Sequence, residues 1–230
     1  MRERGATDAG DECRGQGLRE LQRAADEPLL GRRGLPEGLG GRGVEGHAHP
    51  ETGDGPPENG APRGHDVRED RQRVYGRPDV AWYLLDDPWT RQDAERHVAT
   101  RVARTDLDGE DGALAVVVEH DGTPVGDVTL WFTDRDRRVA EIGWVLDPEH
   151  GGCGLASEAV AAVLHVAFAR YGLHRVTAQT DARNTASAAL AARVGVHREA
   201  HFRQDWWSKG RWTDTLVFAV LATDPLPGRG

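Results

Sequence analysis

Cysteine is scarce in this sequence of 230 residues, which contains only Cys13 and Cys153. Two cysteines so far apart provide neither a disulfide framework nor a cysteine-rich metal site. We therefore expect a protein of the reducing cytoplasm that holds no metal.

Long apolar runs are also missing. No stretch approaches the ~18 uninterrupted apolar residues of a membrane helix, and the beginning of the chain lacks the apolar core of a signal peptide. Lysine is nearly absent, because Lys209 is the only lysine among 29 cationic residues, and the net charge is -9. Such a chain presents no broad basic field. We expect neither nucleic acid nor a membrane as a partner.

Aromatic residues are absent from residues 1–72, since the 7 Trp, 3 Tyr and 4 Phe all lie beyond them. The same stretch holds 15 of the 29 Gly and 6 of the 12 Pro. This composition predicts a low-complexity, disordered segment over 1–72, a folded domain over 73–224 and a tail over 225–230. Two explanations of the first segment stay open: a native disordered tail, or a shifted reading frame of GC-rich DNA.

Apolar periodicity begins after residue 73, and Asp121-Gly122 between two β-branched runs indicates a hairpin. Helices are predicted over 78–86, 90–105, 155–171 and 184–195, and strands over 113–120, 125–132, 139–146, 174–180, 196–207 and 211–221. This order predicts an α+β (α/β-like) fold with a mixed, mostly antiparallel sheet flanked by helices.

A glycine-rich turn follows the strand that ends at Asp147-Pro148. Its sequence, GGCG over 151–154, leads directly into a helix that starts with Leu155 and Ala156. Unpaired amides at the positive end of a helix dipole suit a pyrophosphate, and glycine lets the backbone approach its oxygens. A plain turn is the alternative interpretation. Neither a Rossmann G-x-G-x-x-G nor a Walker motif is present.

Three segments in unbroken order resemble the GNAT superfamily of acetyl-CoA-dependent N-acetyltransferases. They read AEIGWVLDPEHGGCGLASEAV, YGLHRVTAQTDARNTASAALAARVGVHREA and GRWTDTLVFAVL. The resemblance extends from about Pro78 to Leu221 and is strongest to the branch that acetylates ribosomal-protein N-termini and its relatives. It implies a GNAT-type twisted sheet in which the first strand and helix are missing or replaced. Their place is taken by ENGAPRGHDVREDRQR, which shows neither strand alternation nor an amphipathic stripe.

The resemblance implies acetyl-CoA as co-substrate, bound in a V-shaped opening between the strands at 139–146 and 174–180. Gly151 stands where the family has Gln or Arg, and Cys153 where it usually has Lys or Arg, so the amides of the loop must hold more of the phosphate. The implied cofactor-binding residues are Trp144, Val145, Leu146, Gly151, Gly152, Cys153, Gly154, Leu155, Ala156 and Asn184.

Acetyl transfer needs a base for the amine, a donor for the oxyanion and an acid for the departing thiolate. Glu141 is the candidate base, with a surface carboxylate as its alternative and with His120 and His174 as weaker candidates. Many family members use a tyrosine as the acid, but 195–203 offers only Phe202, which leaves Ser187. Asn184 and Ser187 also suit a helix N-cap and its N3 position.

The expected function is transfer of acetyl from acetyl-CoA to a primary amine by direct attack in a ternary complex. Cys153 has no His–carboxylate pair arranged to activate it as a covalent nucleophile. The acceptor is a protein N-terminus or a small-molecule amine. A non-catalytic acyl-CoA-binding module is the rival. The tryptophan-rich tip at 206–212 lines the acceptor site, makes a homodimer contact or packs on its own domain.

Overall fold

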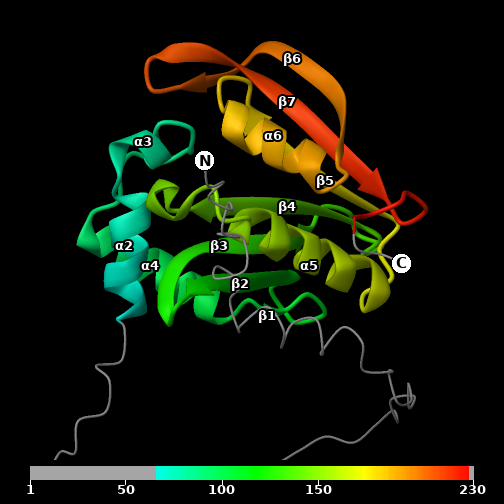
Figure 1. Cartoon of the computed structure of the whole chain (residues 1–230), viewed down its shortest axis with the longest axis horizontal. Helices are drawn as coiled ribbons and strands as arrows, with labels where there is room; N and C mark the ends of the chain where they lie inside the picture. The colour runs from blue at the N-terminus through cyan, green and yellow to red at the C-terminus, as the bar shows by residue number, and fades with distance from the viewer. Residues whose placement is uncertain (1–65, 228–230) are drawn as a thin grey trace, which may run out of the picture. The chain divides into compact units, whose positions relative to one another are not determined.

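The computed structural model describes residues 66–227, and within them seven strands form one sheet in the order β1-β2-β3-β4-β5-β7-β6 (Figure 1). The strands β4 and β5 run parallel, and every other neighbouring pair in this sheet is antiparallel. The predicted α+β class with a mostly antiparallel sheet is confirmed. The strands are β1 Thr105–Asp106, β2 Ala113–His120, β3 Thr123–Phe132, β4 Val139–Leu146, β5 Arg175–Asp181, β6 His197–Ser208 and β7 Arg211–Leu221.

The helices of the described part differ in size and in the face that they cover. They are α2 Val67–Tyr75, α3 Pro78–Ala81, α4 Arg91–Val102, the 3-10 turn η1 Pro148–His150, α5 Leu155–Ala169 and α6 Thr185–Arg193. None of these helices, all between residues 66 and 227, is long and apolar enough to cross a membrane.

The main core lies between the sheet and α5, which crosses one of its faces (Figure 1). Val160 and Leu164 of α5 are fully buried, as are Val128 and Leu130 of β3. Each such side chain contributes about 1.5–3 kcal/mol when it leaves water. The predicted wide apolar stripe of this helix therefore holds the sheet in place, and with it the loop before α5.

The helix α2 corrects the boundary expected at residue 73. Asp66 caps it, its carboxylate accepting from the amide of Arg68 at 2.9 Å, and Arg71, Val74 and Tyr75 are buried. No apolar stripe was visible here because one buried position is an arginine, which is paired with the buried Asp127. The expectations for residues 1–65 and 228–230 lie outside the described residues.

All four predicted helices are shorter in the structure: α5 ends at Ala169 instead of residue 171, and α6 ends at Arg193 instead of residue 195. The helix expected over 78–86 stops at Ala81, and the side chain of Lys209 bonds to the carbonyls of Ala81 and Leu84. The helix expected over 90–105 ends at Val102, because Thr105 and Asp106 form β1 on the edge of β2. Thr90 forms the predicted capping box with Asp93.

Candidate functional site

The parallel strands β4 and β5 pair over only three positions, the last being Glu141 with Thr177. Beyond Glu141 no pairing between the two strands is present in the described sheet, while β4 stays paired with β3 as far as Leu146. The strands therefore separate toward their carboxyl ends. This is the V-shaped opening that the sequence predicts.

The hydrogen-bond alternation of β4 decides which of its backbone groups face the opening. The carbonyl of Val139 accepts from Thr133, and the amide of Asp147 donates to Val125, so these residues direct their groups toward β3. Successive residues alternate, so Val145 also faces β3, whereas Trp144 and Leu146 direct their amides and carbonyls into the opening. Of the three residues predicted to bind through their backbone, Trp144 and Leu146 thus have groups free toward the opening and Val145 does not; the binding itself stays a prediction.

A cavity of about 780 Å³ lies beside the opening, a size suited to a small-molecule or peptide-end ligand. Four parts of the chain form its walls. They are the face of the sheet opposite to α5, the loop that follows α3, the helix α4, and the hairpin formed by β6 and β7. Five of the predicted site residues line this cavity: Glu141, Trp144, Val145, Asn184 and Ser187. Leu146 and the glycine loop are outside this lining.

Glu141 is half-buried at the point where the strands separate. Its Oε2 accepts from the side-chain amide of Gln179 on β5 at 3.1 Å. Burial raises the pKa of Glu141, while the bond from Gln179 opposes part of that rise. A carboxylate with a raised pKa binds a proton more readily, which suits a general base. The weaker base candidates His120 and His174 are not in the lining of the cavity.

Ser187 and Trp144 join the two sides of the opening. The indole Nε1 of Trp144 on β4 donates to Oγ of Ser187 on α6 at 3.2 Å. The side chain of Asn184 accepts from the amide of Ser187 at 3.0 Å and caps α6. The N-cap interpretation of Asn184 is thus confirmed, while its contact with the cofactor stays a prediction. Because Ser187 accepts from Trp144, its own O–H is left to donate elsewhere.

The glycine loop leads from η1 into α5. Gly152 and Gly154 have φ of 85° and 83°, and a Cβ built on either would meet nothing within 4 Å. Their requirement for glycine therefore comes from the backbone conformation and leaves the loop open to a ligand. Gly154 is the N-cap of α5, with no side-chain cap among the described residues. Cys153 is exposed.

An arginine that the sequence analysis missed reaches the start of α5. The Nη1 of Arg193, in the last turn of α6, donates to Oγ of Ser157 in the first turn of α5 at 3.1 Å. Arg193 thus places a cation at the start of α5. The loop before α5 has Gly151 and Cys153 where the family has polar side chains. Only the packing of α6 beside α5 reveals it, since the two residues are 36 positions apart.

An aromatic stack on the far wall of the cavity was also missed. The rings of Tyr75 and Trp89 lie 4.0 Å apart, and those of Trp89 and His97 lie 4.1 Å apart. The guanidinium of Arg101 lies 5.0 Å from the ring centre of Tyr75, a cation–π contact. One signal was available: His97 and Arg101 are four residues apart and share a face of the predicted helix.

The tryptophan-rich tip closes this side of the cavity. Trp206 and Ser208 line it, and Nζ of Lys209 donates to the carbonyl of Leu84 at 2.7 Å. The guanidinium of Arg211 lies 4.6 Å from the ring centre of Trp82 in the loop after α3. The hairpin thus packs on its own domain, which confirms one of the three interpretations, and it lines the cavity. That this cavity is the acceptor site stays a prediction. A homodimer contact stays a prediction.

No group of three His, Cys, Asp or Glu side chains suited to a metal ion occurs among residues 66–227. The polar groups that line the opening are a carboxylate, a hydroxyl and strand amides.

A family model described as Acetyltransferase (GNAT) domain matches residues 61–197. The probable N-acetyltransferase YjcK of Bacillus subtilis (strain 168) is 31% identical over 140 residues, which cover 60% of this chain and 77% of that protein. The crystal structure of a GNAT-family acetyltransferase from Bacillus anthracis is 25% identical with a TM-score of 0.61, covering 69% and 90% of the two chains. Mycobacterium smegmatis RimJ, in complex with CoA-disulfide, is 25% identical with a TM-score of 0.58, covering 70% and 80%.

Proposed function

The chain belongs to the GNAT acetyltransferase family, and we propose from this that it transfers acetyl from acetyl-CoA to a primary amine by direct attack in a ternary complex. A related chain of known structure holds a CoA derivative, which supports acetyl-CoA as the co-substrate. The acceptor that we propose is a protein N-terminus or a small amine of the cytoplasm.

In this proposal the glycine loop holds the pyrophosphate through its backbone amides. The two positive-φ glycines keep the loop free of side chains, and the start of α5 supplies the positive end of its dipole. Arg193 adds a cation within hydrogen-bond distance of Ser157, which offsets the side-chain donors that the loop lacks. The pantetheine arm then lies along the exposed edge of β4, against the amides of Trp144 and Leu146.

The acceptor amine enters from the cavity and attacks the thioester carbon. Glu141 takes the proton of the amine, directly or through one water, and an amide of Trp144 or Leu146 donates to the oxyanion. The C–S bond breaks as Ser187 donates its proton to the departing sulfur. Ser187 then takes a proton from solvent, to which Glu141 releases the proton that it accepted, so the enzyme returns to its starting state. Positioning of the two substrates supplies much of the acceleration, so neither side chain has to be indispensable.

One observation carries the proposal: Glu141, with its raised pKa, and Ser187, with its oriented hydroxyl, line one cavity at the point where β4 and β5 separate. A surface carboxylate and a simple helix N3 serine would not need to meet at such an opening. Their meeting at the opening supports the assignment of a base and an acid on either side of the thioester.

Isothermal titration with acetyl-CoA, together with a thiol-release assay over a panel of amines, tests the proposal. We expect binding and amine-dependent release of CoA. Binding without release for any amine would favour the non-catalytic acyl-CoA-binding module, which the replaced loop side chains Gly151 and Cys153 make the rival. No binding at all would overturn both.

A further inference from the structure

We propose that the acceptor carries an anionic oxygen group, a carboxylate or a phosphate, which binds Arg101 and Arg104 at the end of the cavity away from Glu141. This inference rests on the proposed function for the identity of the reacting amine, and it names the class of amine. Both arginines line the cavity, as does Glu141.

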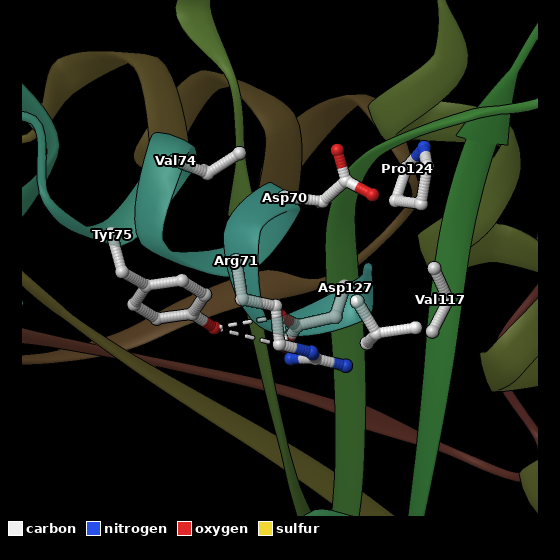
Figure 2. A pocket seen from close by; sticks show the side chains of 9 residues that line it. Asp70, Arg71, Val74, Tyr75, Val117, Pro124 and Asp127 are labelled. Carbon is white, nitrogen blue, oxygen red and sulfur yellow. Dashed lines mark hydrogen bonds and ion pairs between the residues drawn. The ribbon is translucent and has the colours of Figure 1, made fainter. Parts of the chain in front are cut away.

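Charges around Asp127 leave one cation in excess. Its carboxylate accepts from Nη1 of Arg71 at 2.5 Å and from the hydroxyl of Tyr75 at 2.8 Å, as Figure 2 shows from the side of α2. Arg101 places Nη1 3.6 Å from the same oxygen, Oδ2. Burial and the carboxylate of Asp127 both raise the pKa of Tyr75, so the phenol stays neutral. One negative charge therefore faces two guanidinium groups.

Arg104 adds a second excess cation. Its Nε is buried and has no hydrogen-bond partner, and its guanidinium forms no ion pair, among the residues from 66 to 227. Nη1 of Arg101 is buried too and makes no hydrogen bond within the described part, although it forms the 3.6 Å ion pair with Asp127 and its guanidinium contacts the rings of Tyr75 and Trp89. Buried charged donors left without an acceptor cost free energy, which an anionic oxygen between the two side chains would recover.

The acidic side chains of the cavity do not neutralise this end. Asp181 is bonded to Arg183 at 2.6 Å, and Asp86 is an exposed residue 3.6 Å from His97. Burial is the largest influence on His97 and lowers its pKa, which keeps the ring neutral near pH 7. Asp111 is exposed at the rim. Asp86 also acts on the charge of Arg101. Three guanidinium groups, those of Arg71, Arg101 and Arg104, then face the two carboxylates of Asp127 and Asp86, so one positive charge remains in excess.

The sheet register sets the distance between the two ends. Gly143 of β4 lies opposite Thr129 of β3, Thr129 lies opposite Ala115 of β2, and the amide of Ala115 donates to the carbonyl of Arg104 at 2.7 Å. Three inter-strand spacings separate the backbones of Gly143 and Arg104, roughly 14 Å. The arginine side chain shortens this span. An extended peptide with an acidic residue at its second to fourth position would bridge it, at about 3.3 Å per residue.

The experiment compares tetrapeptide amides that have a free N-terminus and carry Asp, phosphoserine, Asn or Lys at position two, three or four. We expect kcat/KM for the best acidic peptide to exceed that for its Asn counterpart by about 10- to 100-fold, the range of a hydrogen bond to a charged group. The Asp and phosphoserine arms distinguish a carboxylate from a phosphate. Equal rates for the acidic and Asn peptides, or preference for the Lys peptide or spermidine, would overturn the inference.

Arg104→Gln should reduce the acid-to-amide ratio to near one, and Arg104→Lys should restore part of it. Arg91→Gln, which removes an exposed arginine at the start of α4, the helix that ends two residues before Arg104, should keep the ratio. Acetyl-CoA titration of each variant reports whether the fold is intact. A ratio that Arg104→Gln leaves unchanged would overturn the assignment.

Direct binding separates this inference from the proposed function. Titration of the Asp and Asn peptides into the protein saturated with CoA measures anion recognition without chemistry. Preferential binding of the Asp peptide without CoA release from acetyl-CoA would support the anion site and contradict the transferase. Acetyl transfer to many amines, without preferential binding of the Asp peptide, would support the transferase and overturn the anion site.

Discussion

The hydroxyl of Ser187 and the carboxylate of Glu141 are each held by one neighbour across the opening. Trp144 donates to the serine from β4, and Gln179 donates to the glutamate from β5. These two bonds orient the side chains before any substrate is present. Orientation by fixed neighbours is what a proton donor and acceptor need.

Ser187→Ala is expected to lower kcat by about 10- to 1000-fold, because general acid catalysis contributes roughly 10²–10⁴. Acetyl-CoA affinity should change little, since the loop that we assign to the phosphates is elsewhere. Steady-state kinetics and titration measure the two effects. Thr185→Ala, an exposed change in the same helical turn, is the control. A full rate for Ser187→Ala would leave substrate positioning as the mechanism.

Glu141→Gln is expected to change the pH dependence as well as the rate. Burial raises the pKa of Glu141 above the ordinary 4.5, and the base works when ionised, so kcat/KM should fall as the pH drops through this raised pKa. The variant should be slower by about 10²–10⁴ and lack that acidic limb. Glu119→Gln on β2, an exposed position, should keep it. An identical profile in Glu141→Gln would assign the base elsewhere.

At the scale of elements, the joint between β4 and α5 combines a paired strand, a short 3-10 turn and a loop of left-handed glycines. Asp147 caps η1 through the amide of Glu149 and forms ion pairs with Arg73 and Arg77. Because Arg73 belongs to α2, the start of the glycine loop is anchored to a helix that lies far earlier in the chain.

Gly154→Val is expected to raise the acetyl-CoA Kd by tenfold or more. A β-branched residue at φ of 83° is strained and would bring a side chain to the phosphate-facing loop. Titration calorimetry measures the change. Gly122→Val, at φ of 74° in the β2–β3 turn and equally without atoms within 4 Å, has the same backbone strain and should leave the Kd unaltered. Equal affinities in the two variants would remove the loop from the cofactor site.

At the scale of the whole molecule, the helix α2 connects the cavity, the glycine loop and the sheet. Arg71 pairs with Asp127 of β3, and Tyr75 stacks on Trp89. Stability of the described domain should therefore depend on the segment that forms α2.

Removal of residues 1–65 is expected to leave the free energy of unfolding unchanged within error. Removal of residues 1–76 should lower it by about 3–5 kcal/mol or more, because Asp127 would lose a buried partner. Urea unfolding of the two truncated proteins and the full chain measures this. A large loss on removing residues 1–65 alone would show that this segment supplies a structural element, and limited proteolysis would locate it.

Local patterns in the sequence were sufficient for most elements and for the place of the opening. Alternation predicted β2 to β4, the wide apolar stripe predicted α5, and the strand–glycine–helix order located the loop, because each pattern depends on residues close together in the chain. Ser187 could be proposed from the family's motif, and Glu141 from its place in the strand that enters the site. The sequence therefore determined the fold class and one side of the site.

Only the tertiary structure decided which strand groups face the opening and what lines the opposite wall. The direction of Val145 follows from pairing with β3, and the burial of Arg71 follows from a carboxylate 56 positions away. Likewise, the excess charge on Arg101 and Arg104 is visible only once Asp127 has been assigned its partners. Pairings between distant residues set these features, and a polar residue carries no local sign of whether its partner will be a protein group or a substrate.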